Sequence, residues 1–316
     1  MLNPSSCTWI FLVGMVIPGA GTVSAQDYPN RPIRIVTGSV GGGSDFTSRQ
    51  IASGISGPLG QPVIVENRAS IIASEVVSKA PPDGYTLLVG GAGVWLTPLS
   101  QKMNYDMADF APLSLISRDV NILVVHPSVP VKSVKELIAL AKARPGELNY
   151  SASLGTALLA SELFKSMAGV RMVHIPYKGA GPAITALVSG EAQLTINEAG
   201  LLAPHVKSGK ARALAVTSAT PSTLTPGLPT VAQSGVPGYE WVGMTHLLAP
   251  AKTPAAIVNR LNQEIVRFLN RAEVKARFLS AGTEIVASSP EELATIIKSD
   301  IDRITRLIRD AGLKLN

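Results

Sequence analysis

The chain has 316 residues, 46% hydrophobic and 16% charged, and its 28 Lys and Arg against 22 Asp and Glu give a net charge of +6. This length and composition exclude a mainly disordered chain and indicate roughly two folded domains. One cysteine, four separated histidines, few aromatics and no run of three basic residues exclude internal disulfides, short-range metal motifs and a nucleic-acid interface, so we expect no metal and no cofactor.

The first 25 residues contain no Asp, Glu, Lys or Arg and include the apolar run Trp9–Ile17. Small residues end this segment at Ala25, which predicts a secretory signal peptide over residues 1–25 that is cleaved after Ala25. A membrane anchor is the alternative, but the apolar run is short for the roughly 20 residues that a membrane span requires.

Short β-branched runs then alternate with helical periodicity, which is typical of a parallel α/β architecture. The predicted strands are 33–36, 63–66, 86–89, 122–125, 149–151, 172–175, 193–196 and 214–217. Segments near 121–126 and 245–249 are predicted to cross between two lobes. Residues 217–240 are rich in Pro, Gly, Ser and Thr and predict an ordered loop. We therefore expect two α/β lobes that are joined by hinge strands, with a cleft between them.

A glycine-rich turn follows the first predicted strand and leads directly into a helix. Its candidate ligand-binding residues are Ser39, Val40, Gly41, Gly42, Ser44 and Asp45. Glycines let a ligand approach the backbone, and the free N–H groups of a helix N-terminus favour an anion, so a carboxylate suits this turn. The turn lacks the dinucleotide and P-loop fingerprints. A plain turn, in which Ser44 or Asp45 only caps the helix, is the alternative.

A second turn of this kind follows the strand at 149–151, in the other predicted lobe. Its candidates are Ser153, Gly155, Thr156 and Ala157. Two helix N-termini that face one cleft can bind one carboxylate between them. The run 151–155 also approximates a nucleophile elbow, with Ser151 in place of the first glycine. A secreted serine hydrolase that uses Ser153, with His205 or His246 as base, is therefore an alternative to a binding protein.

Two more strands end in polar residues. Open α/β sheets bind ligands at the carboxyl ends of their strands, which makes Tyr177, Asn197 and Glu198 further candidates. Asn197 could donate a hydrogen bond to a carboxylate, whereas Glu198 would repel one or pair with a ligand ammonium. A strand-end tyrosine and a solvated loop are the alternative readings of these positions.

Three helix starts carry N-terminal signals. A capping box is predicted at Ser133–Glu136, a Thr253 cap precedes Pro254 at the first helical position, and Ser289–Glu292 combines a capping box with Pro290. The last helix, predicted over about 289–311 with Gly312 as its stop, should pack an apolar face on a sheet. That face contains Leu293, Ile296, Ile297, Ile301, Ile304 and Ile308.

Taken in order, motifs along almost the whole chain after residue 25 resemble the tripartite tricarboxylate transporter solute-binding receptors, the Bug-type family. Besides the glycine turn, the resemblance is carried by Tyr28-Pro29-Asn30-Arg31-Pro32-Ile33-Arg34, Leu59-Gly60-Gln61-Pro62-Val63-Ile64-Val65-Glu66-Asn67-Arg68, Pro82-Asp83-Gly84-Tyr85-Thr86-Leu87, residues 174–179, residues 212–217, Gly235-Val236-Pro237-Gly238-Tyr239-Glu240, Ala249-Pro250-Ala251-Lys252-Thr253-Pro254 and residues 310–315. It implies an α/β, two-lobed periplasmic binding protein of the type II, Venus-flytrap kind. Residues 26–121 plus 247–316 would form one lobe and residues 122–246 the other.

The same resemblance implies a monomeric, non-enzymatic receptor that closes on a small carboxylated solute: a di- or tricarboxylate, an aromatic acid or an amino acid. Its partners would be the membrane permease subunits of the transporter, or alternatively a sensor kinase of a two-component system. In the family the carboxylate is held at the turns that correspond here to 39–45 and 153–157.

Four departures from the family pattern concern the cleft. Ser39-Val40 replaces a proline pair, the glycine-rich stretch after Arg68 is shortened to Ala69-Ser70, Asn197-Glu198 replaces an Asp-Asn pair, and Met244-Thr245-His246 replaces an aromatic Trp-x-Gly element. His246 therefore joins Tyr177 and Glu198 as a second set of candidates. The identity of the carboxylate does not follow from the family.

Overall fold

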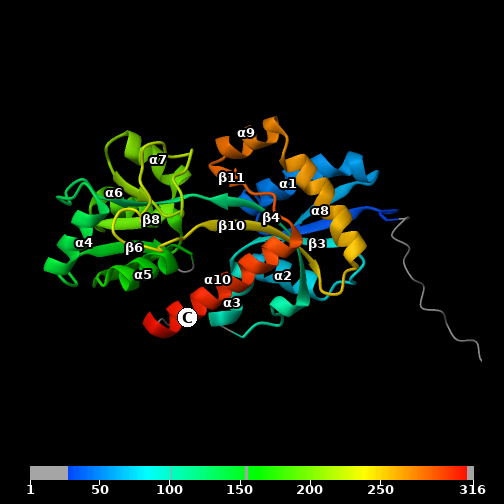
Figure 1. Ribbon diagram of the computed structural model, residues 1–316, viewed down its shortest axis with the longest axis horizontal. Helices are drawn as coiled ribbons and strands as arrows, with labels where there is room; N and C mark the ends of the chain where they lie inside the picture. The colour runs from blue at the N-terminus through cyan, green and yellow to red at the C-terminus, as the bar shows by residue number, and fades with distance from the viewer. Residues whose placement is uncertain (1–27, 101, 154–155, 312–316) are drawn as a thin grey trace, which may run out of the picture.

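The computed structural model describes residues 28–100, 102–153 and 156–311. The predicted signal peptide with its cleavage after Ala25, Gly155 of the second turn and the predicted stop at Gly312 lie outside these residues. Figure 1 shows two α/β lobes side by side. In the part of the chain that the structure describes, no helix is long and apolar enough to cross a membrane.

The first lobe is built on a sheet of strand order β11-β4-β10-β3-β1-β2. These strands are β1 (Ile33–Thr37), β2 (Val63–Asn67), β3 (Thr86–Gly91), β4 (Phe110–Asp119), β10 (Gly243–Pro250) and β11 (Thr283–Ile285). β1 is parallel to β2 and β3, whereas β10 is antiparallel to β3 and β4. β2 pairs with one side of β1 and β3 pairs with the other side. The order in which the chain adds strands to the sheet therefore reverses between β1 and β3.

Helices cover both faces of this sheet and bury its alternating apolar residues. On one face lie α1 (Gly43–Leu59), α8 (Ala255–Leu269) and α9 (Ala272–Ser280), against Leu87 and Val89. On the other lie α2 (Ser70–Ser78), α3 (Gly93–Ser100), the short helix η2 (Met107–Asp109) and α10 (Pro290–Ala311), against Val36 and Leu88.

The second lobe has the strand order β7-β6-β8-β5-β9. Its strands are β5 (Asn121–Val125), β6 (Asn149–Ser153), β7 (Val173–Tyr177), β8 (Leu194–Glu198) and β9 (Arg212–Val216). Its helices are α4 (Val134–Ala143), α5 (Thr156–Ala168), α6 (Ala180–Ser189) and α7 (Ala199–Lys207). β6 is parallel to β7 and β8, so α5, α6 and α7 all begin at the same end of the sheet.

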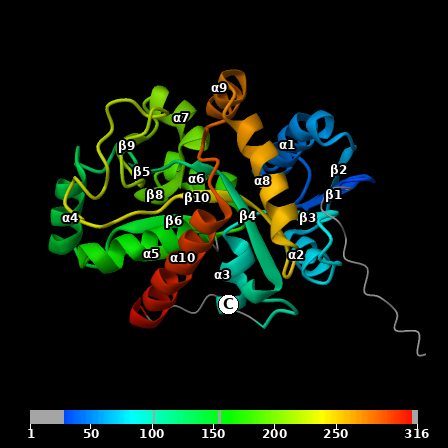
Figure 2. The ribbon, with the colours of Figure 1, turned by 45° about the vertical axis from the view of Figure 1, so that its right-hand side comes forward.

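The chain crosses between the sheets twice. β4 ends at Asp119 and β5 begins at Asn121, and the loop after β9 returns through Trp241 to β10. The predicted crossing segments are thus strands within the sheets, and the crossings lie at their ends. α10 contacts β4 and α3 of the first lobe and α5 of the second, and Figure 2 shows it running between α5 and α3.

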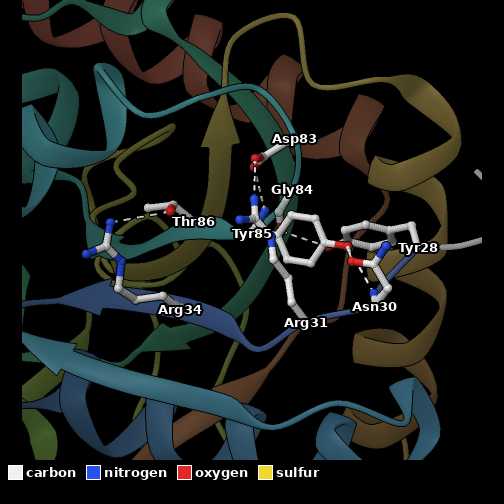
Figure 3. A network of polar contacts seen from close by, with 8 residues as sticks. All are labelled: Tyr28, Asn30, Arg31, Arg34, Asp83, Gly84, Tyr85 and Thr86. Atoms are coloured by element: carbon white, nitrogen blue, oxygen red, sulfur yellow. Dashed lines mark hydrogen bonds and ion pairs between the residues drawn. The ribbon is translucent and has the colours of Figure 1, made fainter. Parts of the chain in front are cut away.

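A polar cluster fixes the start of β1 to the start of β3 (Figure 3). The Tyr28 hydroxyl donates to the Gly84 carbonyl at 2.7 Å, the Tyr85 hydroxyl donates to Asn30 at 2.9 Å, and Arg31 pairs with Asp83 at 2.8 Å. Two of the motifs that carry the family resemblance meet here. They lie at the amino ends of the strands, opposite the glycine turn, so their role is to hold the sheet together.

The predicted strands all occur, with ends shifted by at most two residues, but β4 and β11 were not predicted. The capping box at Ser289–Glu292 is confirmed, since each side chain accepts from the N–H of the other residue. At Ser133 only the cap is confirmed: Ser133 Oγ accepts from the Glu136 N–H, but the Glu136 carboxylate accepts from the Lys132 N–H instead of that of Ser133. The Thr253 cap is wrong. α8 begins at Ala255 after an extended Pro254, and the Thr253 hydroxyl instead donates to the Pro250 carbonyl at 2.7 Å. The apolar face of α10 is buried as predicted.

Candidate functional site

A cavity of about 270 Å³ opens at the carboxyl ends of β1 and β3, where the strand order reverses. Ligands of open α/β sheets bind at such a point. Three helix starts contribute to its wall, since Ser44 of α1, Ser70 of α2 and Gly93 of α3 all line it. The first N–H groups of a helix have no partner within the helix, and the helix dipole favours negative charge there.

The predicted glycine turn forms the mouth of this cavity, with Gly38 and Ser44 in its wall. Ser39, Val40, Gly41 and Gly42 are exposed. Gly41 has a φ of +82°, a conformation that other residues adopt at a cost, and Gly42 is the N-cap of α1. No side chain caps α1, so the alternative in which Ser44 or Asp45 serves as the cap is wrong.

The side chain of Asp45 stabilises the glycine turn. It is only 4% exposed, and its carboxylate accepts from the Gly41 N–H at 2.9 Å and from Asn67 Nδ2 at 2.8 Å. It also forms an ion pair with Arg49 at 3.0 Å. The Gly41 N–H and these side chains lower the pKa of Asp45 to about 2. Both carboxylate oxygens are thus occupied, and Asp45 acts on a ligand through the turn it holds.

In the second lobe, α5 begins with an exposed Thr156 and a buried Ala157, next to the end of β6. Ser153 is the last residue of β6. Its side chain lies outside the described part of the structure. His246 is fully buried in β10 of the first lobe, and His205 lies in the last turn of α7.

The strand-end candidates of the second lobe have different surroundings. The Tyr177 hydroxyl donates to Glu191 at 2.7 Å, and this carboxylate together with burial raises the pKa of Tyr177. Asn197 is 7% exposed, and its Oδ1 accepts from the Glu198 N–H at 3.0 Å. Its Nδ2 has no partner in the described structure, so Asn197 retains a free donor.

Asp119 was missed by the sequence analysis. It ends β4 at the crossing between the lobes, and burial together with the nearby Glu198 carboxylate raises its pKa to about 6. Burial also raises the pKa of Glu198. The charged pair Arg118-Asp119, which interrupts an apolar run, is the signal that could have indicated this position. Two carboxylates from different lobes therefore face each other at the hinge.

His246 lies directly behind the cavity wall. Its ring centroid is 4.7 Å from that of Trp95, and neither of its ring nitrogens has a hydrogen-bond partner in the described part of the chain. Burial lowers its pKa to about 3, so the imidazole is neutral. His246 Nε2 lies 3.7 Å from the position that a Cβ on Gly90 would occupy, and Gly90 lines the cavity.

The site carries no metal-binding arrangement: over the described residues, no group of three or more His, Cys, Asp or Glu side chains could hold a metal ion. The groups that surround the uncharged cavity are backbone N–H groups, hydroxyls and apolar side chains. This arrangement can bind an anionic group at the mouth and an uncharged group inside.

Comparison with known proteins gives consistent results. A model of the tripartite tricarboxylate transporter family receptor (TctC) matches residues 47–313. Protein BugT of Bordetella pertussis is 35% identical over 96% of this chain and 97% of its own length. A solved structure described as R. palustris Rpa4515 with adipate is 36% identical, with a TM-score of 0.74 over 90% of this chain and 99% of that one. MatC from Rhodopseudomonas palustris, solved with bound malate, is 26% identical, with a TM-score of 0.71 over 89% and 100%.

Proposed function

This chain belongs to the tripartite tricarboxylate transporter receptor family, and from that premise we propose that it captures a small carboxylated solute between its lobes and delivers it to the membrane subunits of such a transporter. The resemblance of its motifs is confirmed, as is the two-lobed periplasmic binding protein fold. The family consists of receptors of transporters and not of enzymes. The proposal also includes export by cleavage after Ala25, a monomeric state, and lobes of residues 26–121 plus 247–316 and of residues 122–246.

The observation that carries the proposal is the cavity at the reversal point between β1 and β3, with three helix starts in its wall. A carboxylate at the mouth would accept hydrogen bonds from N–H groups of the turn at 39–44. On closure, the start of α5 at Thr156 and Ala157, and the free donor of Asn197, would approach it from the other lobe. The adipate and malate named for two solved relatives support a carboxylate as ligand.

The proposal is tested by adding a negative charge where the carboxylate would bind. In Gly42→Asp the new side chain stands at the N-cap of α1, where Asp is a favourable residue and where a Cβ meets only the Ser39 carbonyl at 3.5 Å. Binding of the best ligand from a panel of mono-, di- and tricarboxylates and amino acids, measured by calorimetry, should weaken about tenfold or more, because like charges repel at short range. The melting temperature without ligand should not fall.

Gly57→Asp is the matched control. Gly57 lies in the last turn of α1 with open space around its Cβ position, about 20 Å along the helix from Gly42. It adds the same charge to the same helix and should leave the affinity unchanged. Failure of every panel member to raise the melting temperature would refute the carboxylate receptor, and equal effects of the two variants would refute the turn as its site.

Delivery is tested in cells that lack this gene. Loss of uptake of the labelled ligand, restored by the wild-type gene and not by the Gly42→Asp variant, is the expected result. Normal uptake together with a lost transcriptional response to the ligand would instead identify a receptor that serves a sensor kinase.

A further inference from the structure

The cavity between β1, β3, α2 and α3 is uncharged. Of the described residues that line it, none is Lys, Arg, Asp, Glu or His. Its wall consists of backbone at the glycines, hydroxyls such as those of Ser70 and Ser74, and apolar side chains such as those of Leu88 and Val94. A second carboxylate that entered it would lose its hydration without gaining a cation, which is costly.

Two ionisable groups close to the cavity give no help to a buried anion. His246 behind Gly90 is neutral, since burial lowers its pKa to about 3. Arg49 lies on α1 but is paired with Asp45, so its charge is already compensated. The starts of α2 at Ser70 and of α3 at Gly93 are exposed, so they lie with the start of α1 on the open side of the cavity, whereas Ser74, Leu88 and Val94 are buried. The interior is therefore suited to a neutral group, and the mouth, where the helix starts lie, is suited to a negative one.

An apolar rim surrounds that mouth. Val40 is 73% exposed, Ile71 39% and Ile72 45%. A Cβ on Gly38 would lie 3.2 Å from Ser70 Oγ, which brings the segment that carries Val40 next to the start of α2 that carries Ile71 and Ile72. Exposed apolar side chains that gather at a cavity mark a surface that a ligand or a partner covers.

The volume of the cavity limits the size of the ligand group that can enter it. A cavity of about 150 Å³ is enough to hold benzene, so the 270 Å³ available here accommodates one substituted ring or a short alkyl chain. The hydroxyls of Ser70 and Ser74 can in addition meet a neutral polar substituent.

We propose that the ligand is a monocarboxylate whose ring or short alkyl chain fills this cavity while its single carboxylate stays at the mouth. This inference rests on the proposed function and narrows it, because the ligands named for the two solved relatives, adipate and malate, carry two carboxylates. The second charge of such a ligand would point into the uncharged interior.

Two matched pairs of probes test the inference by calorimetry with the purified protein. Hexanoate and adipate have the same number of carbons, and benzoate and benzene-1,4-dicarboxylate have the same ring. The members of each pair differ only at the distal end, where a carboxylate replaces a methyl group or a hydrogen. The monocarboxylate of at least one pair should bind about tenfold or more tightly than its partner. Tighter binding of the dicarboxylates would overturn the inference and leave the receptor function intact, whereas no binding by any carboxylate would overturn both.

A cation that reaches the cavity from its rim should reduce or abolish this preference. Ile71→Arg introduces a cation at a partly exposed position, where the fold tolerates it, and should favour adipate over hexanoate by about tenfold relative to wild type. Val173→Arg adds the same charge at an equally exposed apolar residue of β7 and should leave the ratio unchanged. An unchanged ratio in Ile71→Arg would overturn the assignment of the cavity.

Discussion

At the scale of single residues, Asp45 shows how a correct motif can carry a role that the sequence does not reveal. The order of strand, glycines, Ser44 and Asp45 is local, so the turn itself was predictable. The bonds of Asp45 were not, because Asn67 comes from β2, 22 residues later along the chain. The same limit applies to Asp119 and His246, whose surroundings come from distant strands.

We predict that Asp45→Asn loosens the turn. An amide can accept only part of the hydrogen bonds from Gly41 and Asn67 and loses the ion pair with Arg49, so the free energy of unfolding at pH 7 should fall by about 1–2 kcal/mol, with weaker ligand binding. Because the pKa of Asp45 is lowered to about 2, the advantage of wild type is present above pH 4 and should shrink toward pH 2. Urea unfolding at several pH values measures it. Arg49→Gln, which removes the exposed ion pair and the hydrogen bond from Arg49 to Asn67 Oδ1, should cost less than about 1 kcal/mol. A loss equal to that of Asp45→Asn would contradict the role of the Gly41 bond.

His246 should make the protein sensitive to mild acid. Its folded-state pKa of about 3 lies below the ordinary value of 6.5, so the unfolded chain takes up a proton below pH 6.5 while the folded protein does not, and stability falls as the pH falls. His246→Leu keeps a similar volume beside Trp95 and removes this effect. The difference in free energy of unfolding, variant minus wild type, should rise by about 2 kcal/mol between pH 7 and pH 5. A difference that does not change with pH would show that His246 finds a partner in solution.

At the scale of elements, the sequence predicted those helices and strands whose signals lie within a short stretch of the chain. Alternating apolar runs and capping boxes lie within a few residues, and they gave the strands of both sheets except two and the starts of α4 and α10. β4 contains Pro112 and two register irregularities against β10, which obscure its pattern. β11 is short and is held by pairing with β4. Thr253 failed as a cap because the extended Pro254 shifts the first helical residue to Ala255.

The capping box at the start of α10 is a local sequence signal whose contribution to stability can be measured. Ser289 Oγ accepts from the Glu292 N–H at 3.1 Å, and the Glu292 carboxylate accepts from the Ser289 N–H at 2.8 Å. Ser289→Ala should lower the free energy of unfolding by about 1 kcal/mol, or a few degrees in melting temperature. Ser280→Ala, at the exposed end of α9, removes a hydroxyl that bonds only its own helix and should change the melting temperature by less than about one degree. If both variants melt alike, the capping box contributes nothing.

At the scale of the whole molecule, contacts on two sides of the hinge hold the lobes in the observed arrangement. On one side, Glu284 of β11 accepts from the Ser222 hydroxyl at 2.6 Å in the loop after β9. On the other, Arg303 of α10 donates to the Glu240 carbonyl and lies over the Trp241 ring at 5.3 Å. Closure on a ligand in such a receptor is a shift between arrangements of the lobes, so these contacts set how freely the lobes move.

Removing one of these contacts should therefore change the lobe arrangement more than the fold. Glu284→Ala deletes the acceptor for Ser222 and Thr223, contacts that contribute about 1 kcal/mol together. By small-angle X-ray scattering, the ligand-free variant should have a larger radius of gyration than ligand-free wild type, and saturating ligand should bring both proteins to the same, smaller value. The affinity should fall by at most about fivefold, because the fraction of molecules in the binding-competent arrangement falls by that factor. Glu273→Ala removes an exposed carboxylate from α9 of the same lobe and should change neither quantity. A Glu284→Ala protein with the scattering curve and affinity of wild type would show that the Ser222 contact does not restrain the lobes.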